Sequence, residues 1–269
     1  MKSILLVLLC LACWCNGARV LVLGPFGSYS HKLVYMPIAE SLAEKGHNVT
    51  VVSPFRPKKI VENIREIALV REDDVNFFDF RMLQGLPAVI PRFWFMKQLM
   101  AEIYSDFIHN EQFKAIQGEQ FDVILIDAIF NEFCLPIADL WQVPIVLISP
   151  SIGPPWILGN MGVAHHSASY PSTWTSYSTE MSFTQRLFNT LEVTLAEVAM
   201  DLMVNRPLNA MIKRDFPQAR TIREVTNDLS LCIVTSNPAL NWPRPLPPTI
   251  IEVVGLHIKT PKPLPAVCY

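Results

Sequence analysis

Residues 19–54 read RVLVLGPFGSYSHKLVYMPIAESLAEKGHNVTVVSP, and this stretch decides the fold class. It opens with the unbroken apolar run Val20–Leu23, which is typical of a strand covered on both faces. The spacing of apolar residues predicts a helix over His31–Lys45, with Gly46 as its left-handed stop. A second apolar run, Val49–Val52, follows directly. Strand, helix and strand of these lengths predict a βαβ unit with parallel strands.

The same alternation continues along the chain. Further strands are predicted over Ile67–Val70, Phe121–Ile126, Pro144–Ile148, Leu229–Thr235 and Ile250–Val254. Helices are predicted over Arg92–Ile116, Glu132–Trp141 and about Phe183–Phe216, the last broken before Pro207. The stretch Ser151–Thr184 has little periodicity, which is typical of a functional or flexible loop. The pattern therefore predicts an α/β fold, a Rossmann-like doubly wound parallel sheet.

Composition limits the partners of the chain. Of its 269 residues 51% are hydrophobic and 17% charged, so a substantial core can form. The formal net charge is -2, and no block of Lys and Arg occurs. Because binding to phosphates needs clustered basic residues, nucleic acid is excluded as the main partner. We expect a small or uncharged partner.

The first residues have the layout of a cleaved signal peptide. Lys2 precedes the apolar run Ile4–Trp14, and small residues follow up to Ala18. A buried first strand is the alternative, but Val20–Leu23 already supplies that strand. The run is too short to span a bilayer, which takes roughly 20 residues. We expect residues 1–17 to be the signal, 18–258 one domain and 259–269 a linker or tail. No further segment is predicted to cross a membrane, which places the chain in the endoplasmic reticulum lumen or among secreted proteins.

Cysteines and a sequon fit the same compartment. Without the signal, Cys134, Cys232 and Cys268 remain, too few for a disulfide scaffold and without zinc-ligand spacing. No metal site is therefore expected. Asn48-Val49-Thr50 is a glycosylation sequon, and Asn48 lies where a strand is predicted to begin.

Known nucleotide-binding and hydrolase motifs do not occur. Gly24 and Gly27 have the wrong spacing for the dinucleotide fingerprint, and no acidic residue follows the second strand to hold a ribose. The P-loop, the Gly-x-Ser-x-Gly elbow and the His-Glu-x-x-His motif are likewise missing from the sequence. No tightly bound cofactor is expected.

Two polar residues follow predicted strands at the edge where ligands collect in parallel sheets. His31 opens the first helix, where a positively charged ring is disfavoured, which suits a proton acceptor. Asp127 ends the strongest of the predicted central strands, and a carboxylate there can orient a histidine and stabilise its imidazolium. Alternatively, His31 packs or caps the helix and Asp127 bonds local backbone. Together the two suggest a base and its orienting acid.

An aromatic run lies at the start of the long predicted helix. Phe93, Trp94, Phe95 and Met96 can line a lipophilic pocket, although core packing is the commoner use of such a run.

Several ordered segments resemble a known family. They are Gly24–His31, Pro37–Thr50, Phe121–Ala128, Val143–Pro150, Met181–Leu187, Leu231–Pro238 and Val254–Pro265. These segments look like the N-terminal half of animal UDP-glycosyltransferases, in particular the insect type. Coverage of nearly the whole chain, in the right order, makes the resemblance more specific than any one motif.

The resemblance implies the N-terminal, acceptor-binding domain of a GT-B glycosyltransferase. His31 falls on the family's catalytic base and Asp127 on its acidic partner. The base would take a proton from a hydroxyl of a small lipophilic acceptor, whose oxygen displaces UDP with inversion. We expect the acceptor to be bound by Phe26, Ser28, Tyr29, Phe93, Trp94 and Phe130. The UDP-sugar is a co-substrate, and its site lies in a C-terminal half that we expect this chain to lack.

Two other functions stay open at this stage. A chain without the sugar-nucleotide half could bind lipophiles without catalysis, or pair with full-length UDP-glycosyltransferases and modulate them. A Rossmann-like enzyme with another cofactor is the second alternative, which the missing glycine fingerprint disfavours. An isolated half would expose the face that meets its other domain, so we expect it to associate.

Overall fold

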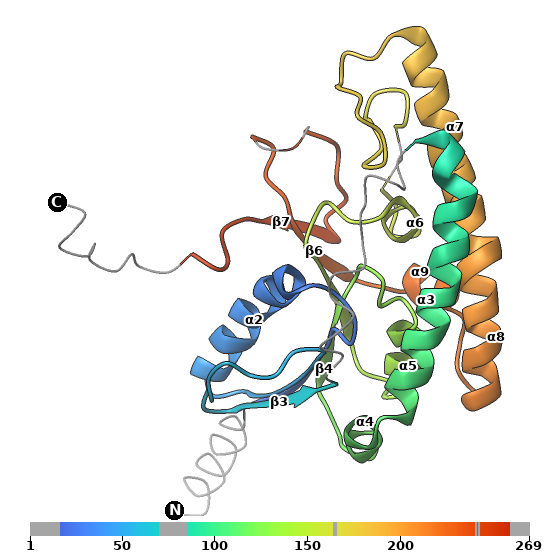
Figure 1. The fold of residues 1–269 in the computed structure, drawn as a ribbon. Coiled ribbons are helices and arrows are strands. Elements are labelled where there is room, and N and C mark those ends of the chain that lie inside the picture. The colour runs from blue at the N-terminus through green and yellow to red at the C-terminus, as the bar shows by residue number, and fades with distance from the viewer. Residues whose placement is uncertain (1–16, 70–84, 164–165, 240, 242, 259–269) are drawn as a thin grey trace, which may run out of the picture.

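A parallel sheet forms the centre of the protein (Figure 1). The computed structural model describes residues 17–69, 85–163, 166–239, 241 and 243–258, and within them the sheet has seven strands. These are β1 (Arg19–Leu23), β2 (Asn48–Ser53), β3 (Ile64–Ala68), β4 (Val123–Asp127), β5 (Ile145–Ser149), β6 (Leu231–Thr235) and β7 (Ile250–Val253). Their order is β3-β2-β1-β4-β5-β6-β7, and each neighbouring pair is parallel. The predicted doubly wound, Rossmann-like sheet is confirmed.

Helices cover both faces of the sheet. One face carries α2 (Tyr29–Glu44), which packs on alternate side chains of the central strands. The other face carries a larger set: α3 (Val89–His109), α4 (Glu111–Ile116), α5 (Cys134–Asp139), α6 (Pro155–Leu158), α7 (Phe183–Ala199), α8 (Arg206–Asp215) and α9 (Ile222–Asn227). Two short segments complete them, η2 (Leu86–Ala88) and the π-helical η3 (Met200–Asn205). Figure 1 shows α2 on one side and α3, α7 and α8 on the other.

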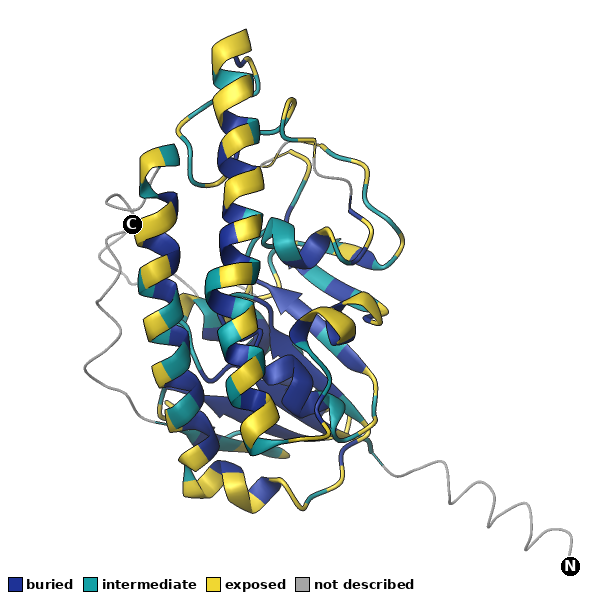
Figure 2. Cartoon of the chain, turned by 90° about the vertical axis from the view of Figure 1, so that its right-hand side faces the viewer, coloured by how far each residue is buried: buried dark blue, intermediate teal, exposed yellow. Residues whose placement is uncertain are grey.

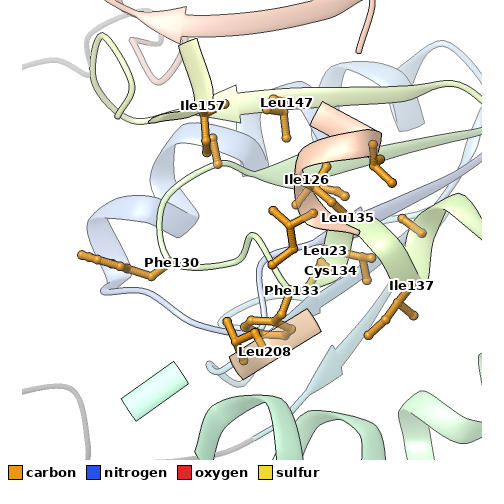
Figure 3. Close-up of a cluster of buried hydrophobic side chains, with 14 of the residues drawn as sticks. Leu23, Ile126, Phe130, Phe133, Cys134, Leu135, Ile137, Leu147, Ile157 and Leu208 are labelled. Atoms are coloured by element: carbon orange, nitrogen blue, oxygen red, sulfur yellow. The ribbon is translucent and has the colours of Figure 1, made fainter. Parts of the chain in front are cut away.

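The strand alternation divides the core into two clusters. In β1, Val20 and Val22 point to the α2 side, whereas Leu21 and Leu23 join the larger cluster. All four are at most 1% exposed, as expected for a central strand. Figure 3 shows part of the larger cluster, with labelled side chains from β1, β4, β5, α5, α6 and α8 gathered in one region.

Several predicted boundaries shift. The third strand was predicted over Ile67–Val70 and occupies Ile64–Ala68, with Val70 outside the described residues. The predicted helix Arg92–Ile116 is two helices, because Asn110 leaves the helical backbone at ψ 124°. The Asn110 side chain accepts hydrogen bonds from the amides of Gln112 and Phe113 and caps α4.

The predicted break before Pro207 is wrong. The chain continues through η3 into α8, with Pro207 in its first turn. Proline has no amide hydrogen to donate, and the wider π turn just before it absorbs the change of register. The loop predicted over Ser151–Thr184 also contains the single short helix α6 among its described residues.

Other features concern the termini, the cysteines and the membrane. The predicted signal peptide and the tail 259–269 fall outside the described residues, apart from Gly17. Cys134 and Cys232 are buried free thiols. In the described part of the chain, no helix combines the length and apolarity needed to cross a bilayer.

Candidate active site

The site lies where the winding of the sheet reverses. Strands β1 and β4 are neighbours, yet the chain leaves β1 into α2 on one face and leaves β4 into α5 on the other. The two connecting loops therefore diverge above the carboxyl ends of these strands. In open parallel sheets, ligands bind in the crevice at such a switch point.

His31 and Asp127 meet at this point. His31 is the third residue of α2, and its Nδ1 lies 2.7 Å from Oδ2 of Asp127, the last residue of β4. The carboxyl side chain is 2% exposed and the imidazole 19%, so the ring alone reaches the surface. When Nδ1–H donates to the carboxylate, the lone pair on Nε2 is left to accept a proton. This geometry is what a general base needs.

Burial of the Asp127 carboxyl sets its protonation. Loss of water contact raises the pKa of Asp127, while the hydrogen bond and charge of His31 lower it. The amide of Ile129 also donates to Oδ1 of Asp127 at 3.2 Å, which favours the ionised form. Both carboxylate oxygens thus have donors, and their direction is fixed.

Gly27 controls the position of the imidazole. Its φ of +136° is a conformation that residues with a Cβ rarely adopt. A Cβ at this position would lie 3.0 Å from Nδ1 of His31 and 3.1 Å from its Cγ. The ring therefore packs directly against a glycine backbone, and a larger residue would push it from Asp127.

Asn131 joins the two loops that carry the pair. Its Oδ1 accepts from the amide of Phe26 at 2.8 Å, and its Nδ2 donates to the carbonyl of Phe26 at 3.0 Å. Nδ2 also donates to the carbonyl of Ile129, and the side chain is fully buried. Sequence reasoning missed this residue; its signal was a short amide side chain four residues after Asp127.

Aromatic residues lie on the segments that follow β1, β2 and β4. Phe26 and Phe130 pack edge to face with ring centroids 6.0 Å apart. Phe130 has φ +63°, the left-handed region, which is strained for an aromatic residue and recurs at functional sites. Tyr29 packs its edge against Phe55, and the ammonium of Lys58 lies 3.9 Å from its ring centroid.

A second buried acid lies close to the pair. Glu132 is 3% exposed, and its Oε1 accepts a hydrogen bond from Nε1 of Trp156 at 3.1 Å. Burial raises the pKa of Glu132 to about 7; the Trp156 hydrogen bond opposes this, and the charge of Asp127 adds to it. The edge of the site thus holds a carboxyl group that is half protonated near neutral pH.

The predicted acceptor residues divide into two groups. The loop residues are at the site edge with the pair: Phe26, Ser28, Tyr29 and Phe130. The two helical residues diverge from each other, because consecutive helix residues point in different directions. Phe93 is fully buried and packs against Trp156, whereas Trp94 is 56% exposed on the outside of α3, with Lys97 over its ring.

Other predicted sites are also placed. Asn48 is exposed at the start of β2, while Thr50 of the same sequon is buried. In the described ranges, no three His, Cys, Asp or Glu side chains form a group that could hold a metal ion.

Comparison with known proteins decides the family. Residues 18–268 match the family described as UDP-glucoronosyl and UDP-glucosyl transferase. The chain belongs to this family. As a UDP-glycosyltransferase family member it is 29% identical to UDP-glucosyltransferase 2 of Dactylopius coccus, a match that covers 93% of this chain and 50% of the relative. It is 26% identical to an ecdysteroid UDP-glucosyltransferase of Autographa californica nuclear polyhedrosis virus (93% and 51% covered). Human UDP-glucuronosyltransferase 2B7 is 24% identical (98% and 54% covered).

This family member therefore spans about half the length of the curated relatives it matches. Solved structures with a similar chain path include the kitacinnamycin glycosyltransferase, at a TM-score of 0.48 and 14% identity, covering 84% of this chain and 48% of that one. Another is SnogD of Streptomyces nogalater, at 0.47 and 12%, covering 93% and 55%. These likenesses are distant, so the assignment rests on the family match. UDP-sugars are the donors of the family.

Proposed function

We propose that this chain supplies the acceptor site and the catalytic base of a UDP-glycosyltransferase. The observation that carries the proposal is the 2.7 Å contact between His31 Nδ1 and the buried Asp127 carboxyl at the switch point. Nε2 is then free to accept a proton, and the partly exposed ring can be approached by a hydroxyl. The lipophilic rings of Phe26 and Phe130, on the loops that follow β1 and β4, suit a small apolar acceptor such as a phenol or alcohol.

The proposed reaction is a single inverting displacement. The acceptor hydroxyl gives its proton to Nε2 of His31 as its oxygen bonds to the anomeric carbon of the sugar. The bond from that carbon to UDP breaks at the same time, and UDP leaves with the electron pair. Asp127 stabilises the imidazolium that forms, without taking the proton itself. UDP-sugar is a substrate in this scheme, held by the half of the family's fold that this chain does not match.

A transfer assay tests the base. Residues 18–258 would replace the matching half of the Dactylopius coccus UDP-glucosyltransferase 2, and transfer from UDP-glucose to 4-nitrophenol would be measured. General base catalysis contributes about 10²–10⁴-fold, so His31→Ala should lower kcat by at least about 100-fold. Asp127→Asn should lower kcat comparably while acceptor binding persists.

His47→Ala is the matched control. The Nδ1 of His47 accepts from the amide of Ala18 at the opposite end of the sheet, far from the pair in the fold. The kcat of the His47→Ala variant should stay within about threefold of the parent value. A His31→Ala protein that keeps a tenth or more of the parent kcat would rule out the base, and leave a binding or regulatory function.

We also propose that the chain enters the secretory pathway and is glycosylated at Asn48. The signal-like start of the sequence and the exposure of Asn48 support this. The chain expressed in insect cells should lose mass on treatment with peptide N-glycosidase, and Asn48→Gln should not. An unchanged mass of the parent chain would contradict glycosylation.

A further inference from the structure

A groove lies at the amino edge of the sheet, opposite to the edge that carries His31 and Asp127. This amino-edge groove has a volume of about 400 Å³ and is lined by the starts of β1, β2 and β3 and by the turn between α4 and β4. Asn48, which heads the single Asn-x-Ser/Thr sequon of the sequence, is one of the lining residues. A glycan on Asn48 would therefore begin inside the groove.

Strand alternation decides which side chains line the groove. Residues two positions apart in a strand point to the same face of the sheet, so Arg19 shares the face of Leu21 and Arg65 that of Ile67, both in the larger core cluster. Asn48 stands beside Arg19 in the parallel register of β1 and β2. Figure 2 is viewed toward this face, where the strands are buried behind the helices. At the amino edge this cover ends, and the three polar side chains are exposed.

Glu119 holds the two arginines in place. Its Oε1 accepts a hydrogen bond from Nη2 of Arg65 at 2.9 Å, and its Oε2 accepts from Nη2 of Arg19 at 3.1 Å. The carbonyl of Glu119 accepts from Nε1 of Trp141 at 2.8 Å, which fixes the turn that carries the carboxylate. Nη2 of Arg65 also donates to Oγ1 of Thr50 at 3.2 Å. The walls of the groove are therefore linked to one another.

Both guanidinium groups keep hydrogen-bond donors for a ligand. Within the described residues, Nη2 is the one side-chain nitrogen of Arg19 and of Arg65 that donates a hydrogen bond, so Nε and Nη1 of each are left over. The ring of Phe121 gives the groove an apolar wall, and the Arg19 guanidinium lies 5.7 Å from its centroid. Donors beside an apolar wall suit a sugar, which offers hydroxyl and carbonyl oxygens on a ring with C–H faces.

Charge favours an uncharged ligand. Arg19 and Arg65 bring two positive charges to the groove, and Glu119 brings one negative charge. A second negative charge comes from Asp122, whose carboxylate accepts from the backbone amide of Arg19 at 2.7 Å. A phosphate or carboxylate ion would therefore meet almost no net attraction here, whereas a neutral sugar needs only the donors.

Resting on the glycosylation proposed above, we propose that the amino-edge groove binds the first N-acetylglucosamine of the glycan on Asn48. This sugar is joined to Nδ2 of Asn48, and so short a tether holds it beside the arginines at an effective concentration of about millimolar or more. Weak contacts are then enough to keep the groove filled. The bound sugar would cover Arg19, Arg65 and Glu119 and link the starts of β1, β2 and β3.

The rate at which the glycan is released from the native chain tests this binding. Peptide N-glycosidase cleaves the bond between Asn48 and the first sugar, so a bound sugar has to leave the groove before cleavage. The full chain from insect cells would be digested without denaturant, and release followed by mass. Two hydrogen bonds of ordinary net strength should slow release roughly tenfold or more, relative to a glycan in open solvent.

The matched control carries its glycan outside the groove. In a chain with both Asn48→Gln and Glu180→Asn, the second change creates a sequon with Ser182 on an exposed bend before α7. That glycan should be released from the native chain about as fast as from the denatured chain.

Two variants remove the donors of the groove. Release from Asn48 should approach the control rate in Arg19→Gln and in Arg65→Ala. Because Arg65 also bonds Thr50 within the fold, Arg19→Gln is the milder of the two changes. Thermal unfolding followed by circular dichroism checks that each variant keeps the parent fold.

Three results would overturn the proposal. The first is native release from Asn48 as fast as from the control chain. The second is slow release that both arginine variants leave unchanged. Either result would leave glycosylation itself intact. The third is a parent chain whose mass does not change even after denaturing digestion, which would contradict the glycosylation as well.

Discussion

Replacement of Glu132 by glutamine should make the protein more stable at alkaline pH and change it little in acid. The buried carboxyl has a pKa of about 7 in the folded chain, against an ordinary value of 4.5. The folded state therefore holds this proton more tightly than the unfolded state does. Below pH 4.5 both states carry the proton, and the group has no effect on the free energy of unfolding.

The magnitude follows from these two values. As pH rises from 4.5 to 7, the unfolded state loses the proton first, so the folded protein becomes less stable. Each pKa unit corresponds to about 1.4 kcal/mol, so the full loss above pH 7 is about 3 kcal/mol. Glutamine does not ionise, and its oxygen can still accept from Nε1 of Trp156, which now bonds Glu132 Oε1. Glu132→Gln should thus raise the free energy of unfolding by about 0.4 kcal/mol at pH 4.5 and by about 3 kcal/mol at pH 8, relative to the parent.

Urea unfolding followed by circular dichroism at both pH values measures this difference. In thermal unfolding at pH 8, the melting temperature of Glu132→Gln should lie about 5–10 °C above that of the parent. The control is Glu44→Gln, an exposed glutamate at the end of α2, which should change the free energy of unfolding by less than about 0.5 kcal/mol at either pH. A gain that is equal at pH 4.5 and pH 8, or a variant that is less stable at pH 8, would refute the argument.

Three further predictions concern a buried ion pair, the glycine beside His31 and the buried amide of Asn131, each measurable by urea unfolding. Glu192→Ala removes the carboxylate 2.6 Å from the fully buried Arg92 and should lower the free energy of unfolding by about 3–5 kcal/mol. The double variant Arg92→Met with Glu192→Leu should recover most of this loss, and no recovery would contradict the argument. Gly27→Ala should lower the free energy of unfolding by about 1–3 kcal/mol, because the alanine Cβ would clash with the imidazole of His31. The downfield Nδ1 proton resonance of His31 should also disappear, and an unchanged resonance would disprove the contact. Asn131→Ala removes the three hydrogen bonds of the buried Asn131 side chain and should lower the free energy of unfolding by about 2–3 kcal/mol. Amide exchange in the β1–α2 loop should become faster, and exchange at the parent rate would show that Asn131 does not hold this loop.

The sheet could be predicted because its signals are local. The continuous apolar runs of β1, β2 and β4 indicate strands covered on both faces, and their apolar residues are buried. Gly46 follows the end of α2 with φ +86°, as predicted. The predicted helix boundaries were wrong where a single side chain decides whether the helix continues. Asn110 can cap a helix or continue one, and the choice depends on its contacts with the next turn.

The site was partly predictable for the same reason. His31 and Asp127 each follow a recognisable strand, so the common edge was expected, and their contact is now seen. The switch point required the strand order, which local patterns do not contain. Phe93 and Trp94 looked alike in sequence, yet one turned into the core and the other to solvent. Which face a helix buries depends on tertiary packing.

The strand order also affects how the protein forms during synthesis. The unit β1–α2–β2 can fold as soon as it leaves the ribosome, but β1 then has one unpaired edge, which awaits β4. The partner of His31 lies 96 residues further along the chain. Until Asp127 has emerged, the nascent chain exposes Leu21 and Leu23 and has no assembled pair. The centre of the sheet is therefore the surface that a chaperone has to protect longest, and the chemistry of the site matures with the closing of that edge.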